Sequence, residues 1–330
     1  MLRLPAVHVH QPASLADAIA LRARLGATAR WVAGGTDLLP NLKLHMVQAE
    51  HLVSLRRVAE LHGIAVDATT GELSIGAATR LADVATDPAV MARAPLLAFA
   101  AGRVASPQLR NMGTLGGNLC LDTRCRYINQ SELWREALGG CLKSHGTECH
   151  VVPGGQGCVA ALSSDTAPVL IVHGAAVDVA QPDGGTRVVA VADLYDSDGL
   201  WHVRLHPGEV LVRVRVPRQP ATARHAYRKW AVRASIDFPL VSVALRIDLA
   251  AEAPPATVAG GRLAVGALGP RPRVLDLAPF AGRSLDETFA LELGDFAFAR
   301  CRPLPNVPYD AAYRRERLVV EVRRAVRGMQ

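Results

Sequence analysis

The chain has 330 residues, of which 50% are hydrophobic and 20% charged, and its formal net charge at pH 7 is +7. This size and composition are typical of a globular protein with two or three lobes, each large enough to bury a core. No run of 18 apolar residues occurs and the first 14 residues lack a signal-peptide pattern, so we expect no membrane span and a cytoplasmic location. Lysine and arginine are scattered and only 5% of residues are aromatic, which argues against a nucleic-acid partner and favours an acidic protein partner.

The N-terminal part predicts a helix, a strand and a glycine turn. Ser14 is a typical N-cap for a helix over 15–25, and Gly26 is a typical stop. A strand over 30–32 then runs into Gly34-Gly35 and a second helix N-terminus, where free N–H groups and a helix dipole would suit a pyrophosphate. The turn matches neither G-x-G-x-x-G nor a P-loop, so a plain strand-to-helix connection remains the alternative.

A second glycine turn follows at 114–118. Before it we expect a strand over 52–55, a hairpin of 64–66 with 73–75, a helix that begins near Arg80 with Thr79 as its cap, and a helix over 89–104. Gly116 and Gly117 would let backbone N–H groups approach a ligand closely, and Thr114 and Asn118 could hydrogen-bond phosphate or ribose.

Four cysteines, Cys125, Cys141, Cys149 and Cys158, come next in a glycine-rich stretch. Two disulfides are one alternative, although thiols stay reduced in the cytosol. Structural zinc is another, since histidines lie among the cysteines, but paired C-x2-C half-sites are absent. Unligated core cysteines are a third, although such a loop supplies little structure to bury them. Four thiolates from one flexible loop could also hold an iron-sulfur cluster, so the residues themselves indicate a metal or cluster site.

The rest of the chain predicts a further sheet and a separate C-terminal lobe. Strands are expected over 169–172, 176–179, 188–191 and 211–216, and Pro217 and Pro220 then mark a break. The C-terminal lobe has expected strands near 242–249 and 262–266, a Pro-rich connection at 253–255, and a helix over 311–327 with a solvated arginine face.

Five motifs in this order, VAGGTDLLP, TLGGN, SSDTAP, GEVLVRVRVP and AYRKW, resemble the FAD-binding medium subunit of the xanthine oxidase family of molybdenum hydroxylases. The resemblance covers nearly the whole chain, and the ordered set is far more specific than any one glycine pair. Relative to ordinary members, 119–163 contains an insertion. The inserted four-cysteine loop is similar to that of the beta subunits of 4-hydroxybenzoyl-CoA reductases, where it carries a 4Fe-4S cluster.

The resemblance implies particular site residues. The two turns would wrap the FAD pyrophosphate and adenosine, and three later positions, from Asp165 to Lys229, would lie nearer the flavin. The implied FAD contacts are Val32, Ala33, Gly34, Gly35, Thr36, Asp37, Leu38, Leu39, Val104, Thr114, Leu115, Gly116, Gly117, Asn118, Asp165, Leu211 and Lys229. The implied cluster ligands are Cys125, Cys141, Cys149 and Cys158, which leaves Cys120 and Cys301 as bystanders.

The fold implied is α+β. It comprises a two-subdomain FAD-binding fold of the vanillyl-alcohol-oxidase kind, residues 1–51 and 52–216 with the inserted loop at about 119–163, and an α/β C-terminal lobe over 217–330. Cys125 lies seven residues after Asn118 and Cys158 seven before Asp165, so the chain itself would hold a cluster within roughly 25 Å of flavin-binding residues.

The function implied is electron transfer without a catalytic residue in this chain. Electrons would pass from ferredoxin through the 4Fe-4S cluster and FAD to two 2Fe-2S clusters on a small subunit. They would then reach molybdenum on a large subunit, where 4-hydroxybenzoyl-CoA becomes benzoyl-CoA, in a dimer of heterotrimers. One alternative is another molybdenum hydroxylase whose medium subunit passes electrons out to NAD or a quinone. A zinc-stapled scaffold that has lost flavin is a second, although the phosphate turns are intact.

Overall fold

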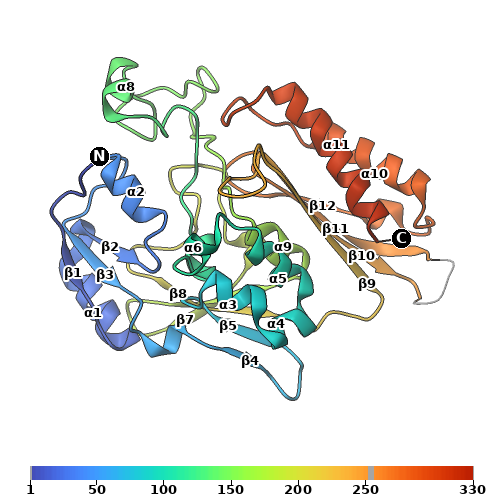
Figure 1. Ribbon diagram of the computed structural model, residues 1–330, viewed down its shortest axis with the longest axis horizontal. Coiled ribbons are helices and arrows are strands. Elements are labelled where there is room, and N and C mark those ends of the chain that lie inside the picture. Colours follow the sequence, from blue (N-terminus) through green and yellow to red (C-terminus); the bar gives the residue numbers. More distant parts are fainter. Residues whose placement is uncertain (1, 252–255, 330) are drawn as a thin grey trace.

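The computed structural model describes residues 2–251 and 256–329, which form three sheets and their covering helices (Figure 1). The N-terminal sheet is parallel, in the order β1 (His8–His10), β3 (His51–Ser54), β2 (Ala29–Val32). The expected Pro-rich connection at 253–255 lies outside the described residues.

Two short helices accompany the N-terminal sheet. Helix α1 (Leu15–Leu25) has the predicted ends: Ser14 Oγ accepts from Asp17 N at 3.1 Å, and Gly26 has a φ of 59°. Helix α2 (Leu38–Lys43) begins directly after the first glycine turn, so the turn lies between β2 and a helix N-terminus as expected.

The middle sheet is antiparallel throughout. Its order is β4 (Ile64–Val66), β5 (Leu73–Gly76), β8 (Val210–Val216), β6 (Ala176–Ala180), β7 (Thr186–Ala190). The predicted hairpin of 64–66 with 73–75 is therefore confirmed, and the strands expected over 176–179 and 188–191 pair as β6 and β7.

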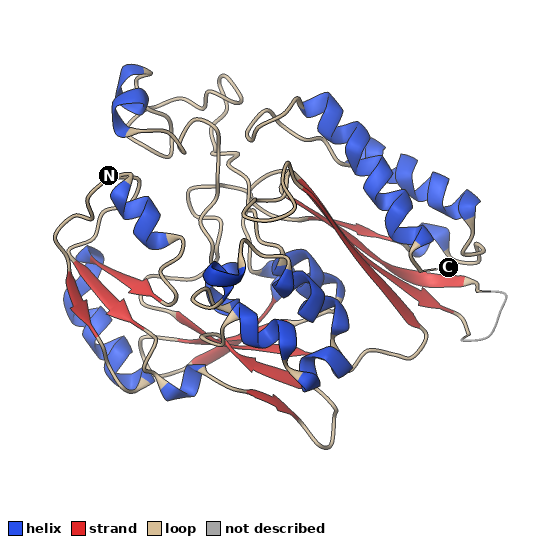
Figure 2. Ribbon diagram, in the orientation of Figure 1, coloured by secondary structure: helices blue, strands red, loops and turns tan. Residues whose placement is uncertain are grey.

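Helices cover one face of the middle sheet (Figure 2). These are α3 (Leu81–Thr86), α4 (Pro88–Arg93), α5 (Pro95–Gly102), α6 (Pro107–Arg110), α7 (Leu115–Leu119) and α9 (Thr166–Val172), while α8 (Glu132–Ala137) lies in the projecting inserted loop.

Two of the secondary-structure elements expected in this region are wrong. The helix predicted over 89–104 is divided into α4 and α5, because Pro95 starts the second helix and cannot continue the first. The predicted strand over 169–172 is part of helix α9, all seven residues of which are buried between layers. A fully buried helix shows no polar face, so its short apolar run looks like a buried strand.

The C-terminal lobe is an antiparallel sheet with a helix layer. Its order is β12 (Arg273–Asp276), β11 (Val258–Gly266), β10 (Val241–Leu249), β9 (Ala223–Trp230), and α10 (Glu287–Arg300) and α11 (Ala311–Arg327) cover one face. Helix α9 contacts the other face through β10 and β11, so this sheet shares the core of the middle lobe.

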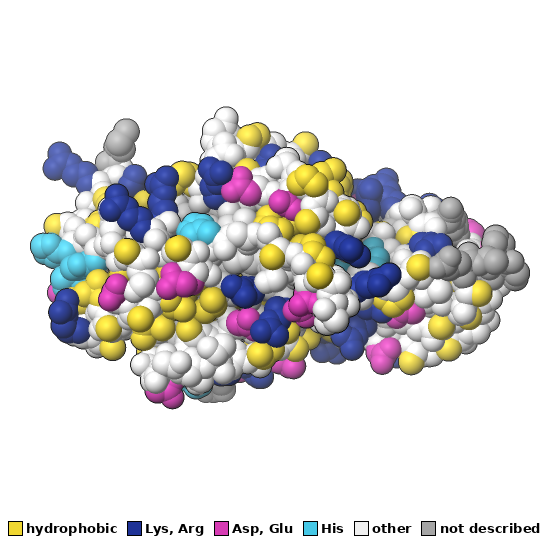
Figure 3. Space-filling model, turned by 90° about the horizontal axis from the view of Figure 1, so that it is seen from below, with side chains coloured by type: hydrophobic (Ala, Val, Ile, Leu, Met, Phe, Trp, Pro, Cys, Tyr) yellow, Lys and Arg dark blue, Asp and Glu magenta, His cyan; other side chains and the backbone are white. Residues whose placement is uncertain are grey.

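The predicted boundaries between the three domains stay a proposal, and the boundary between residues 51 and 52 falls inside β3. Among the described residues, no helix combines the length and apolar character needed to cross a bilayer. On the face drawn in Figure 3, basic side chains are spread out with acidic side chains among them.

Candidate functional site

A cavity of about 490 Å³ is lined by all three lobes. Its walls come from the first glycine turn, the second glycine turn, the start of β8 and the loop after β9. All of the predicted FAD contacts line it except Leu39, Leu115 and Lys229. Leu39 packs against Gly35, and Leu115 is buried in the core of the middle lobe.

The first glycine turn meets the backbone of the two residues just before the second glycine turn at this cavity. A Cβ on Gly34 would lie 2.0 Å from the Met112 carbonyl oxygen and 2.9 Å from the Gly113 Cα, so no side chain fits there. Gly35 has a φ of 70°, which favours glycine. Among the described residues, the backbone N–H groups of Gly34, Gly35 and Thr36 have no acceptor. They are donors available to an anionic ligand.

The second turn offers different groups from those expected. Gly116 N donates to Ala77 O at 2.8 Å and Gly117 N to Thr114 Oγ1 at 3.0 Å, because Thr114 caps α7. These N–H groups are therefore not free for a ligand, and the glycines provide close backbone approach only. A Cβ on Gly116 would lie 2.8 Å from the Ala77 Cβ.

Asn118 is oriented by the later SSDTAP motif. Its Oδ1 accepts from Ser164 Oγ and from Thr166 Oγ1, both at 2.7 Å. With the oxygen engaged, the amide nitrogen is the group that Asn118 can present to a ligand in the cavity. The motif thus supports the turn from behind.

Lys229 acts on Asp165 and does not line the cavity. Its Nζ lies 2.8 Å from Asp165 Oδ2, and their side chains are 8% and 3% exposed. Tyr227 donates to Asp165 Oδ1 at 2.6 Å, so both carboxylate oxygens have partners from β9. Burial raises the pKa of Asp165, and the charge of Lys229 opposes that shift. The group tied to the cavity wall is the carboxylate, while Lys229 also donates to Arg103 O at 3.0 Å.

The cavity wall from the C-terminal lobe carried no sequence signal. Phe238 lines the cavity, and the Arg124 guanidinium carbon lies 3.9 Å from the centre of its ring. Arg124 also pairs with Asp37 at 2.6 Å, although burial still raises the pKa of Asp37. Ile236 N donates to Ala105 O at 3.0 Å, which joins the loop to the middle lobe. These contacts depend on distant segments meeting, so no local pattern reveals them.

The four predicted cluster cysteines line one second cavity of about 20 Å³. All six cysteines of the chain are free thiols, so no disulfide staples the loop. Burial raises the pKa of Cys125 to about 11, and it raises that of Cys158 as well. Among the described residues, no three His, Cys, Asp or Glu side chains form a group that could hold a metal ion in this conformation. The described side chains are therefore not arranged around a single metal ion, and this applies to zinc and to the four cysteines alike.

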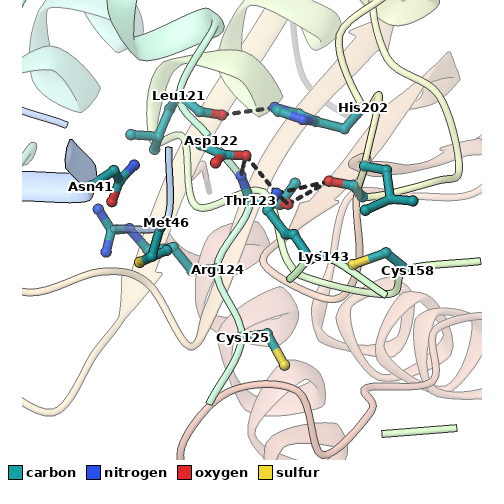
Figure 4. Close-up of polar contacts among 12 residues, drawn as sticks. Asn41, Met46, Leu121, Asp122, Thr123, Arg124, Cys125, Lys143, Cys158 and His202 are labelled. Carbon is teal, nitrogen blue, oxygen red and sulfur yellow. Dashed lines mark hydrogen bonds and ion pairs between the residues drawn. The ribbon is translucent and has the colours of Figure 1, made fainter. Parts of the chain in front are cut away.

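A short segment, 121–125, contributes residues to the linings of both cavities, and Figure 4 shows how its labelled side chains lie. Asp122 and Arg124 line the larger cavity, and Cys125 lines the smaller one. Arg124 also forms a reciprocal backbone bridge with Ala161, at 2.8 and 2.7 Å. Cys120, predicted as a bystander, lines the larger cavity.

Comparisons with known protein sequences cover most of the chain. A family model described as the FAD binding domain in molybdopterin dehydrogenase matches residues 5–219. The aldehyde oxidoreductase FAD-binding subunit PaoB of Escherichia coli K12 is 36% identical over 277 residues, which are 78% of this chain and 80% of PaoB. The putative xanthine dehydrogenase FAD-binding subunit XdhB of the same strain is 31% identical over 241 residues, 73% of this chain and 68% of XdhB.

Solved structures agree. A chain of the carbon monoxide dehydrogenase from Hydrogenophaga pseudoflava lacking the Mo-pyranopterin moiety superimposes with a TM-score of 0.78 and 28% identity, over 99% of this chain and 98% of that chain. A chain of quinoline 2-oxidoreductase from Pseudomonas putida 86 gives a TM-score of 0.76 and 26% identity, with the same coverage.

Proposed function

Because the chain belongs to the FAD-binding medium subunits of the xanthine oxidase family of molybdenum hydroxylases, we propose that its larger cavity holds the FAD through which electrons pass to partner subunits. FAD binding, the α+β FAD-binding fold and the role of an oxidoreductase subunit follow from the family. The residue contacts within the cavity are part of the proposal.

The groups around the cavity suit the parts of FAD. The free N–H groups at Gly34 to Thr36 can hold the pyrophosphate, and the Asn118 amide can donate to a phosphate or ribose oxygen. Val104 and Leu211 supply apolar wall for a planar ring. When bound, FAD supplies a carrier that exchanges electrons one or two at a time. The protein holds and orients it and keeps water from its faces.

We further propose that the cysteine cavity carries a 4Fe-4S cluster. The single observation that carries this proposal is that Cys125, Cys141, Cys149 and Cys158, from separate parts of the inserted loop, line one cavity. The rest of that lining is largely apolar, as Ile128 illustrates, and a set of four soft thiolates, two of them buried, suits iron and sulfide. A cluster spreads its four thiolates around a cube of four irons, so their arrangement differs from that around a single ion.

The role that fits both cofactors is that of the beta subunit of a 4-hydroxybenzoyl-CoA reductase. Electrons from ferredoxin would enter at the cluster, pass to FAD, and leave for two 2Fe-2S clusters on a small subunit. A molybdenum-cofactor large subunit would then remove the phenolic hydroxyl of 4-hydroxybenzoyl-CoA to give benzoyl-CoA. The assembly would be a cytoplasmic dimer of heterotrimers, and this chain would contribute no catalytic residue.

The second candidate is a medium subunit that passes electrons out of a molybdenum hydroxylase to NAD or a quinone. The names of the relatives favour it, since PaoB is described as part of an aldehyde oxidoreductase and XdhB as part of a putative xanthine dehydrogenase. It gives no role to the four cysteines that share a cavity.

Cysteine variants test the cluster. We expect Cys141→Ser or Cys149→Ser to lose about four irons per chain and the broad iron-sulfur absorbance, because serine replaces a soft thiolate poorly. FAD, which is bound by other segments, should stay. Cys301→Ser is the matched control, since Cys301 lies in the core of the C-terminal lobe and should affect neither cofactor. Equal iron content in wild type and in the three variants would refute the cluster assignment.

Rapid-mixing kinetics separate the two candidate functions. Reduced ferredoxin should reduce the flavin of the complete complex, and Cys141→Ser should slow that step at least tenfold while FAD content is unchanged. A flavin that exchanges electrons with NADH at the same rate in both proteins would favour the second candidate.

A further inference from the structure

A nearly buried lysine, Lys143, contacts the segment 121–125 that lies between the two cavities. Lys143 is 11% exposed, and its Nζ lies 2.6 Å from Asp122 Oδ1, which is 29% exposed. It also donates to Thr123 Oγ1 at 2.5 Å and to Gly199 O at 2.8 Å (Figure 4). An ammonium has three N–H donors, so all of them are engaged.

These three bonds join the walls of both cavities. Lys143 lines the cysteine cavity, and Asp122 lines the larger one. Gly199 is fixed to the cysteine loop independently, because its N–H donates to Cys158 O at 2.7 Å. Asp122 is fixed to the first glycine turn, because its N–H donates to Asp37 Oδ2 at 3.2 Å. Lys143 therefore ties the Cys158 side of the cysteine cavity to the wall of the FAD cavity.

Lys143 also sets the charge at the cysteine cavity. Among the described residues that line this cavity, it alone carries a permanent charge. With every N–H engaged elsewhere, Lys143 has no donor left for a thiolate. It acts on the cavity through its charge and its position, at a depth where solvent screens charge poorly.

Resting on the proposed function, we propose that Lys143 is a positioning residue that fixes the cysteine cavity to the FAD cavity and raises the reduction potential of the cluster. A fixed positive charge beside a cluster stabilises its more negative, reduced state. Asp122 partly offsets that charge. An ion pair that also contacts the wall of the FAD cavity would then adjust the reduction potential of the electron-entry centre.

Two substitutions of opposite sign test this. In anaerobically purified complex, the cluster potential is measured by a dithionite titration followed by electron paramagnetic resonance. Lys143→Met should lower the potential, because it removes the positive charge. Asp122→Asn should raise it, because the lysine charge is then less offset. Lys43→Met is the matched control, since Lys43 is exposed at the end of α2 and should leave the potential unchanged.

Iron content separates this proposal from the proposed function. Wild-type complex with no iron beyond that of the two 2Fe-2S clusters on the small subunit would overturn the proposed function, and this inference with it. If the 4Fe-4S cluster is present in every protein and its potential in Lys143→Met and Asp122→Asn equals that of wild type, only the role of Lys143 is overturned. If Lys143→Met does not fold or loses its iron, Asp122→Asn decides, because it keeps the lysine: a raised potential supports the proposal, and an unchanged one refutes it.

Discussion

Substitution of Gly34 tests whether the contact between the two glycine turns forms the FAD site. A Cβ at this position would lie 2.0 Å from the Met112 carbonyl oxygen and 2.6 Å from its carbonyl carbon, and both atoms belong to the backbone. Neither can rotate away, so Gly34→Ala must push the turns apart. Overpacking typically costs about 1–3 kcal/mol, and a backbone contact this short belongs at the upper end. If the substitution destabilises the FAD-binding arrangement of the turns by about 3 kcal/mol, FAD affinity falls roughly 150-fold.

The assay is titration of deflavinated protein with FAD, followed by quenching of flavin fluorescence. Gly260→Ala is the matched control, because a Cβ there meets no atom within 4 Å. We expect the control to bind FAD like wild type. The reasoning is refuted if Gly34→Ala binds FAD within threefold of wild type, since the close approach at Met112 would then play no part in the site.

Two further predictions concern stability. Lys229→Met should lower the free energy of unfolding, measured by urea denaturation, by about 3–5 kcal/mol, because it leaves the buried Asp165 carboxylate without the Lys229 cation. The control Lys43→Met should stay within about 0.5 kcal/mol of wild type. Equal effects of the two substitutions would contradict the ion-pair role of Lys229. The rings of His173 and His225 stack with their centres 4.6 Å apart. Burial is the main cause that lowers their pKa values, to about 4 for His173 and about 3 for His225. Below pH 6.5 the unfolded chain binds protons that the folded chain does not, so the free energy of unfolding should fall between about pH 6.5 and pH 4. His225→Phe should reduce this loss between pH 7.5 and pH 5.0, and parallel stability profiles for both proteins would show that the assignment is wrong.

Local patterns were sufficient for elements whose ends are fixed by local chemistry. The limits of α1 follow from the Ser14 cap and the Gly26 stop, and both are read directly from the sequence. The strand predicted over 169–172 failed because burial on all sides removes the polar face that distinguishes a helix. Thr79 does not cap helix α3, because its hydroxyl donates to Gly63 O, and α3 starts at Leu81, one residue beyond the predicted start near Arg80.

Part of the candidate site could likewise be predicted from the sequence, and part depends on the tertiary fold. Motif order located both glycine turns, and the two lie together at one cavity. It did not show that Gly116 and Gly117 have engaged N–H groups, because that depends on Ala77 and on the Thr114 cap. Nor did it place Lys229 behind Asp165. A residue type at a motif position indicates proximity to a ligand, but the tertiary fold decides which atom faces it.

The most direct test of the account is the cofactor content of the chain purified without oxygen. Iron, acid-labile sulfide, zinc and FAD are measured on the same sample as the protein concentration. We expect about four irons, about four sulfides and about one FAD per chain, with no zinc. FAD without iron, or one zinc per chain in place of iron, would contradict an electron-entry role for the cysteine cavity.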